Sequence, residues 1–283
     1  MWLCLVNENR KNELFINKNI LIMSDYLSKL HNNDTSLTTL NLHFDNIGDI
    51  GASNLAKALL KNTTLTTLYL SCNKIGDVGA SNLAKMLLKN TTLTTLDLYF
   101  NNIGDVSASE LAKALLKNTT LTTLYLGYNY IGDNGTSNLA KALLENTTLT
   151  TSDLSVNNVG DVGASNLSKA LLENTTLKKL NLSDNNIGDI GASNLAKALL
   201  KNTTLTSLYL YGNNINNDII KNIEAELRMN IWSPCNSYNY DPKMYILGKC
   251  LSITYPGFPI ELVLLLYEYV YVWLDEYEYK ICF

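Results

Sequence analysis

The chain has 283 residues, a formal net charge of −4 and an apolar fraction of 46%, values that are ordinary for a folded soluble protein. This mildly acidic balance lacks the broad basic field of a protein that binds nucleic acid or an anionic membrane. Five scattered cysteines without a CxxC pair favour a reducing compartment over a disulfide framework.

Neither a secretory signal nor a membrane span is expected from the sequence. The apolar run after Met1 is too short for a signal peptide. The most apolar run, residues 260–274, contains Glu261 and Glu268 and is shorter than the roughly 20 residues that a span needs. We therefore expect a cytoplasmic protein without a membrane partner.

Residues 1–36 precede the first full copy of a repeat and are expected to form an N-terminal cap. Leu27, Lys29 and Thr35 stand 28 residues before equivalent residues of the first full copy. Residues 23–33 therefore resemble the helical half of a repeat that has lost its strand, which would shield the first apolar layer. Residues 1–20 are expected to be irregular or partly helical.

The segment LTTLNLHFDNIGDIGASNLAKALLKNTT, residues 37–64, returns at a fixed period of 28 residues, so that seven copies fill residues 37–232. Such a period predicts a solenoid, in which each copy is one supersecondary unit stacked on its neighbours. We number positions in every copy from its first leucine, and the copies begin at Leu37, Leu65, Leu93, Leu121, Leu149, Leu177 and Leu205.

Each copy predicts a short strand followed by a helix. Alternation at positions 3 to 7 directs Leu40 and Leu42 inward, as in a half-buried strand. Gly48-Asp49 predicts a turn, with Asp49 accepting a hydrogen bond from the first turn of its own helix. An apolar stripe at helical spacing then runs to about Lys61.

The pattern LxxLxLxxNxI at this period resembles leucine-rich repeats, and the long helical half with GDxGA resembles the ribonuclease-inhibitor-like subclass. That subclass also occurs in NOD-like receptors and in GTPase-activating proteins for Ran. The resemblance implies an α/β fold, a curved solenoid with parallel strands on the concave face and helices on the convex face. It also implies a buried asparagine at position 9 that bonds the backbone of adjacent turns, at Asn73, Asn101, Asn129, Asn157, Asn185 and Asn213.

Two copies depart from the pattern. Ser152 replaces the inward leucine of the fifth strand, either as tolerated drift or as a flexible point. The seventh copy degenerates at residues 216–218 and continues with apolar residues up to Leu227. We interpret it as a last helix adapted to its end position.

The composition changes in residues 233–283, where a loop followed by a short aromatic helix is expected. All four prolines lie within residues 231–259, and Pro259 precedes an apolar run. The simplest prediction is a C-terminal cap. Alternatively, Phe258-Pro259-x-Glu261-Leu262 weakly resembles the opening of an F-box, which implies a Skp1-type adaptor as partner. A membrane-surface or tail-anchor role is the third alternative, which the two glutamates of the apolar run oppose.

Sequence variation among the copies is concentrated on the predicted concave side, whereas outward lysines of the helices recur unchanged. The variable positions 5, 7 and 8 are rich in tyrosine, which is a common binding anchor but also favours strands by itself. Recent duplication with chance variation is the alternative explanation. The predicted residues for binding a protein or peptide are Tyr69, Asp97, Tyr99, Phe100, Tyr125, Tyr128, Asp153, Tyr209 and Tyr211.

No motif in the sequence predicts catalysis, a metal or a cofactor. His31 and His43 lack a recognisable catalytic partner, and the GDxG runs lack the features of phosphate or calcium loops. The recurring NTT triplets are formal glycosylation sites, but a role at the helix end is favoured. They begin at Asn62, Asn90, Asn118, Asn146, Asn174 and Asn202.

The sequence therefore predicts a non-enzymatic protein-binding scaffold that uses the concave face of its solenoid. The alternatives are a ubiquitin-ligase substrate adaptor, through the F-box-like segment, and a regulator of a small GTPase. The composition, rich in Asn, Lys, Ile and Tyr, resembles repeat proteins of AT-rich bacteria, protists or large DNA viruses. For an effector of that kind, the working compartment would be a host cytoplasm.

Overall fold

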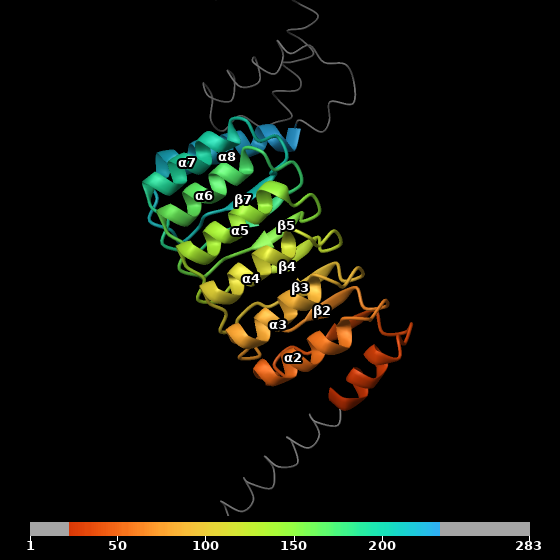
Figure 1. Ribbon diagram of the computed structural model, residues 1–283. Helices are drawn as coiled ribbons and strands as arrows, with labels where there is room; N and C mark the ends of the chain where they lie inside the picture. The colour runs from red at the N-terminus through yellow and green to blue at the C-terminus, as the bar shows by residue number, and fades with distance from the viewer. Residues whose placement is uncertain (1–22, 233–283) are drawn as a thin grey trace, which may run out of the picture. The chain divides into compact units, whose positions relative to one another are not determined.

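The structure is a computed structural model that describes residues 23–232 of the chain. Seven parallel strands form one sheet in which the spatial order follows the sequence order (Figure 1). Each strand pairs in register with the residue 28 positions on, as Thr39 does with Thr67. The strands are β1 (Thr39–Asn41), β2 (Thr67–Tyr69), β3 (Thr95–Asp97), β4 (Thr123–Tyr125), β5 (Thr151–Asp153), β6 (Lys179–Asn181) and β7 (Ser207–Tyr209).

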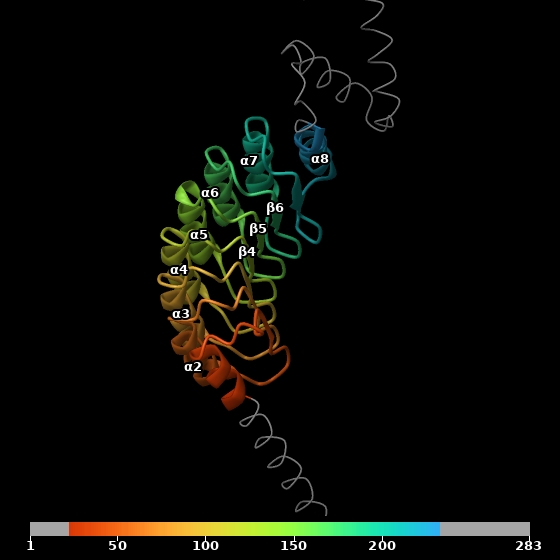
Figure 2. The same cartoon turned by 90° about the vertical axis from the view of Figure 1, so that its right-hand side faces the viewer.

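A helix follows every strand, and residues 23–31 form a further helix before β1. Within the repeat unit, α2 to α7 form a layer on the outer side of an arc and the strands lie on its inner side (Figure 2). The predicted α/β solenoid is therefore confirmed. The helices are α2 (Gly48–Leu59), α3 (Asp77–Leu87), α4 (Asp105–Leu115), α5 (Asp133–Glu145), α6 (Asp161–Leu171), α7 (Asp189–Leu199) and α8 (Asn217–Trp232).

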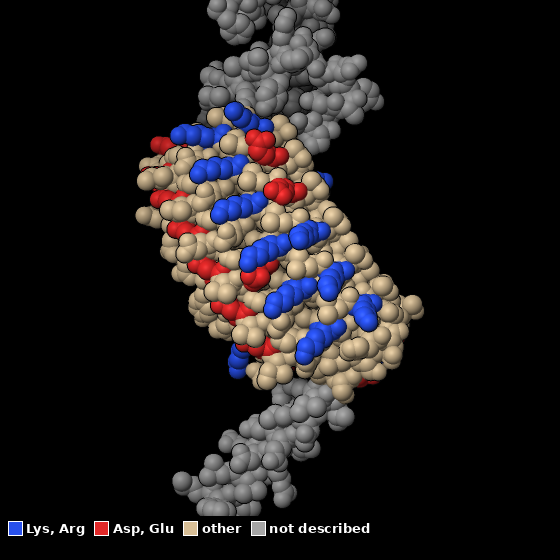
Figure 3. Space-filling model, viewed as in Figure 1, with Lys and Arg blue, Asp and Glu red and all other residues tan. Residues whose placement is uncertain are grey.

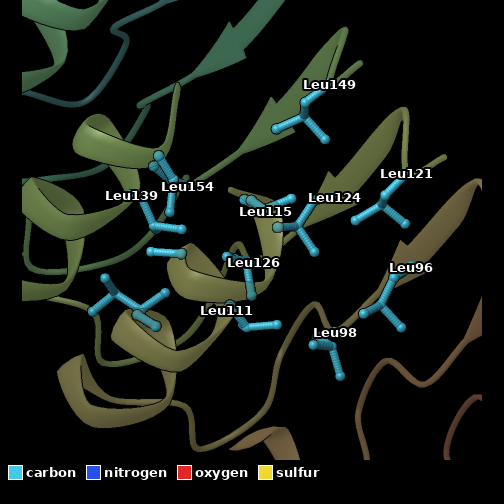
Figure 4. Close-up of a cluster of buried hydrophobic side chains, with 14 of the residues drawn as sticks. Leu96, Leu98, Leu111, Leu115, Leu121, Leu124, Leu126, Leu139, Leu149 and Leu154 are labelled. Atoms are coloured by element: carbon cyan, nitrogen blue, oxygen red, sulfur yellow. The ribbon is translucent and has the colours of Figure 1, made fainter. Parts of the chain in front are cut away.

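The core lies between the two layers and consists of stacked leucines. In the central copy, Leu121, Leu124 and Leu126 are at most 1% exposed. Leucines of successive strands lie beside one another and face leucines from the helices, such as Leu111 and Leu115 (Figure 4). Each buried leucine stabilises the fold by about 1.5–3 kcal/mol relative to exposure, so the repeated pattern fixes the register of every copy.

Aspartates at position 13 cap the following helix, so the expectation that Asp49 caps its own helix is wrong. The Asp49 carboxylate accepts hydrogen bonds from the N–H groups of Gly76 and Gly79, at 2.8 Å each, where α3 begins. Asp105 does the same for the start of α5. Each carboxylate therefore satisfies free N–H groups and complements the dipole of the neighbouring helix, which joins one copy to the next.

Buried asparagines join the copies along two further rows. At position 9, the Asn101 amide donates to the carbonyls of Leu70 and Leu98, at 3.0 Å each, and its oxygen accepts from Ile75 N–H at 2.9 Å. At position 26, the Asn90 amide donates to the Leu59 carbonyl at 2.8 Å. Asparagines at position 26 are only 3–6% exposed, which leaves no room for a glycan on the NTT triplets.

The two copies that depart from the repeat pattern, the fifth and the seventh, still place the corresponding residues in the interior. Ser152 is 7% exposed and stands in register between Leu124 and Leu180 of the adjacent strands. In α8, Ile223 and Leu227 are buried against the core. The predicted C-terminal cap and F-box-like helix, residues 233–283, lie outside the described residues, as do residues 1–22.

Candidate partner-binding face

The strands present a grid of outward side chains, because alternation buries the leucines and directs positions 5 and 7 away from the core. We call positions 5, 7 and 8 of the seven copies the strand face. Neighbouring strands lie about 4.8 Å apart, so the face extends over roughly 30 Å. The strand register places the residues of position 5 in one row across the sheet. In order, they are Asn41, Tyr69, Asp97, Tyr125, Asp153, Asn181 and Tyr209.

Position 8 has a left-handed backbone in every copy. The φ angles are 61° at Phe44, 59° at Cys72, 53° at Phe100, 58° at Tyr128, 51° at Val156, 53° at Asp184 and 73° at Gly212. Glycine and aspartate suit this conformation, whereas for other residues it costs about 1–2 kcal/mol. The aromatic residues at this position therefore hold a strained backbone, a feature that concentrates at functional sites.

An aromatic cluster, consisting of Tyr99, Phe100 and Tyr128, lies at the centre of the strand face. The Phe100 and Tyr128 ring centroids are 4.8 Å apart, and those of Tyr99 and Tyr128 are 5.7 Å apart. Phe100 is 49% and Tyr128 44% exposed. Gly127 makes room for the Tyr99 ring, since a Cβ there would meet it at 2.7 Å.

Tyr130, two residues after Tyr128, is a further exposed aromatic residue and was not among the residues predicted from the sequence. It stands at position 10 and is 64% exposed. The available signal was its residue type, because every other copy has asparagine or lysine at this position.

A partly buried carboxylate lies between the tyrosines of the position-5 row. Burial raises the pKa of Asp97, although the Tyr99 N–H at 2.8 Å and the Ser71 hydroxyl both donate to it. The charge of Asp153 raises the Asp97 pKa further. Burial also raises the pKa values of Tyr99 and Tyr125. The centre of the face is thus aromatic and acidic.

His43 has a polar partner that no sequence motif indicated. Its Nδ1 lies 2.5 Å from Ser71 Oγ, in the turn after β2 of the next copy, and the Ser71 hydroxyl also bonds Asp97. In a Ser-His-Asp triad the histidine stands between the hydroxyl and the carboxylate. Here the serine stands in the middle, so the order needed to activate a nucleophile is absent from this group.

The structure brings most of the predicted binding residues together on β2 to β5 and the turns that follow them. Tyr209 and Tyr211 instead lie at the β7 end and are 54% and 83% exposed. Within residues 23–232, no group of histidine, cysteine and carboxylate side chains is arranged to hold a metal ion. None of the helices in that range is long and apolar enough to cross a membrane.

The stacked strand–helix units define the class of protein as a parallel α/β solenoid. The chain belongs to the leucine-rich-repeat family, as the sequence resemblance predicted, because the family model described as Leucine Rich repeat matches it over more than half its length. The matched segments are residues 33–56, 61–84, 89–112, 117–140, 145–168, 173–196 and 201–223.

Several solved structures are similar to the chain. Actin-binding site 2 of leiomodin-1 is 30% identical with a TM-score of 0.44, covering 48% of this chain and 79% of that one. The tropomodulin C-terminal domain from Caenorhabditis elegans is 16% identical with a TM-score of 0.47, covering 53% and 90%. Pollen receptor kinase 3 is 19% identical with a TM-score of 0.37, covering 56% and 67%. No curated protein sequence matches the chain.

Proposed function

We propose that the protein is a non-enzymatic scaffold that binds another protein with its strand face. The observation that carries this proposal is the exposed aromatic cluster on a strained backbone. Phe100 and Tyr128 both have positive φ angles and are about half exposed. Asparagine at the same place would relieve the strain, so retaining rings there points to a use other than folding.

The composition and size of the face support a protein partner. Tyrosine and phenylalanine offer a large contact area and lose little side-chain entropy on binding. A face extending over roughly 30 Å is wide enough for a standard interface of about 800 Å² per partner. The acidic centre at Asp97 and Asp153 adds electrostatic selectivity, which sets the choice of partner more than raw affinity.

The test is partner capture from cytoplasmic extract, quantified by mass spectrometry. The bait variant F100N/Y128N removes two rings of the aromatic cluster while relieving backbone strain, so that its fold is retained. We expect it to lose the partners that the wild-type protein captures. A hot-spot pair of this kind typically contributes at least 2 kcal/mol to binding, which corresponds to a roughly 30-fold loss of affinity.

The matched control is V78A/V106A, which truncates two side chains of the helix layer that are 64% and 66% exposed. This variant should capture the same partners as the wild type. Circular dichroism of all three baits shows whether they are folded. Equal capture by F100N/Y128N and the wild type would overturn the proposal.

The other two functional hypotheses stay predictions. The ubiquitin-ligase adaptor depends on residues 256–283, which lie outside the described residues. The GTPase-regulator hypothesis depends on fold resemblance alone, which is weak support for a specific activity. Cysteine usage favours a cytoplasmic location, and Cys72, on the strand face, is a free thiol.

A further inference from the structure

A second surface lies on the helix layer, over α2 to α4. At position 24 it exposes leucines, with Leu60 38%, Leu88 43% and Leu116 42% accessible. Exposed lysines stand three residues before and one residue after each leucine. In Figure 3 the lysines form two columns on this side of the molecule. We call this surface the lysine–leucine patch, consisting of Lys57, Leu60, Lys61, Lys85, Leu88, Lys89, Lys113, Leu116 and Lys117.

The second lysine column has a boundary, whereas the first column and the exposed leucines of position 24 recur in the later copies. In α5 and just after α6, position 25 holds Glu145 and Glu173 in place of lysine, which ends the second column. Lysine returns at Lys201, after α7. The double lysine column is therefore continuous only over α2 to α4.

The patch carries mostly uncompensated positive charge. Of its six lysines, Lys113 alone has an ion pair with another described residue, to Glu110 at 2.7 Å. Lysines near helix C-termini also complement the helix dipole, which explains part of the pattern. That role does not explain the exposed leucine of position 24, which recurs in the later copies but stands between two lysines of the sequence in three successive copies only over α2 to α4.

We propose that the lysine–leucine patch docks an acidic amphipathic helix of a partner protein. The apolar side of that helix would cover the three leucines, and its flanking carboxylates would pair with the two lysine columns. Packed helices lie 8–10 Å apart, so three of them span about 20 Å. A docked helix of about 14 residues has that length. A nucleic-acid backbone offers the charge but has no apolar side for the leucines, so the protein helix fits better.

The test uses a synthetic 16-residue peptide with leucines at helical spacing along one side and glutamates on both flanks. Its binding to the full chain is measured by fluorescence anisotropy. A scrambled peptide of the same composition is the control for amphipathicity. We expect the amphipathic peptide to bind at least about tenfold more tightly than the scrambled one, with an affinity that falls as salt rises.

The variant K61E/K89E/K117E places in the patch the residue that the same position holds at Glu145 and Glu173, so the repeat tolerates it. It should bind the peptide at least about tenfold more weakly. The reciprocal variant E145K/E173K extends the double column and should bind more tightly. The strand-face variant F100N/Y128N should bind the peptide like the wild type, which separates this site from the proposed function.

Three results would overturn the proposal. One is equal binding of the peptide by K61E/K89E/K117E and the wild type. Another is equal binding of the amphipathic and scrambled peptides, which would reduce the patch to non-specific charge. The third is tighter binding of a 16-base-pair DNA duplex or of phosphatidylserine vesicles than of the peptide, which would assign the patch to a nucleic acid or to a membrane.

Discussion

Phe100 and Tyr128 occupy a backbone conformation that suits asparagine or glycine. Each has a φ angle above 50°, and the left-handed region costs about 1–2 kcal/mol for a residue of their type. We expect F100N to raise the free energy of unfolding by about 1 kcal/mol, the relief of strain less the lost contact with the Tyr128 ring. Urea denaturation of the single variant measures this change.

The control for that prediction is D184N. Asp184 has the same backbone conformation, with a φ angle of 53°, but is already a residue type that tolerates it. This variant should leave stability within about 0.5 kcal/mol of the wild type. A loss of stability in F100N would mean that the ring contacts outweigh the backbone strain.

Asp97 makes the stability of the fold depend on pH. Burial, together with the charge of Asp153, raises its pKa above the ordinary value, which is about 3.9. A raised carboxyl pKa means that folding favours the protonated form. The stabilising contribution is therefore fully present below the unfolded pKa and is lost as pH rises through the folded pKa.

The prediction is that D97N, which removes the charge, is more stable than the wild type at pH 7. The difference should shrink as the pH falls through the raised folded pKa of Asp97, and should stop changing below about 4, where the carboxyl is protonated in both the folded and the unfolded state. Thermal unfolding midpoints of both proteins across this range measure the effect. A difference that stays constant with pH would show that shape, rather than charge, is responsible.

At the scale of elements, each helix from α3 to α7 depends on the preceding copy for its N-terminal cap. The Asp105 carboxylate accepts hydrogen bonds from Gly132 N–H at 2.7 Å and Gly135 N–H at 2.9 Å, at the start of α5. We expect D105A to lower the free energy of unfolding by about 1 kcal/mol. Hydrogen exchange should accelerate at those two amides of α5, and not at the first amides of α4.

The matched control for this cap is D189A. Asp189 accepts a hydrogen bond from Asn216 N–H at 2.7 Å, before α8, and bridges fewer amides than Asp105. We therefore expect D189A to lower the free energy of unfolding by less than D105A does. Faster exchange at the start of α4 in D105A would instead mean that the aspartate acts on its own helix.

In strand β5, Ser152 leaves an inward position without its leucine. Leu124 and Leu180 flank it in register and are at most 1% exposed, so the site has the surroundings of a leucine. We expect S152L to raise the free energy of unfolding by about 1.5–3 kcal/mol. The reverse change in the adjacent strand, L180S, should lower it by a similar amount. No gain in S152L would show that the copies have closed around the serine.

At the scale of the whole molecule, the 28-residue period was enough to predict the solenoid, because buried leucines at fixed positions specify strand, helix and register together. Two features could not be predicted. The partner of Asp49 depends on how neighbouring copies stack, which no single repeat reveals. The left-handed turn at position 8 was hidden because residues such as Phe100 and Val156 are poor indicators of that conformation.

For the candidate binding face, the sequence was enough to predict which side chains point outward, but not which of them contact one another. Alternation of apolar and polar residues along the strands is enough to direct Tyr99 and Tyr125 outward. The contact of Tyr99 with Tyr128 needs the space above Gly127, and the hydrogen bond between His43 and Ser71 joins the turns of two adjacent copies. Both depend on side-chain conformations, which a repeat pattern does not determine.

A solenoid has no single central core, so its cooperativity depends on the contacts between adjacent copies. Asn129 makes one of these contacts in the middle of the unit. Its amide donates to the Leu98 carbonyl at 3.0 Å, and its oxygen accepts from Ile103 N–H at 3.0 Å, both in the preceding copy. Alanine would leave the buried Ile103 N–H without a partner, which costs about 1–3 kcal/mol, whereas the Leu98 carbonyl would still accept a hydrogen bond from the Asn101 amide.

We therefore expect N129A to lower the free energy of unfolding by about 1–3 kcal/mol and to split unfolding into two transitions, one for the copies on each side. The control N213A removes an equivalent but half-buried amide at the end of the array. It should lower the free energy of unfolding by less and keep a single unfolding transition. Urea denaturation followed by circular dichroism, with hydrogen exchange to locate each transition, distinguishes the two. Equal loss and equal broadening in both variants would mean that the solenoid unfolds as one unit regardless of where adjacent copies are uncoupled.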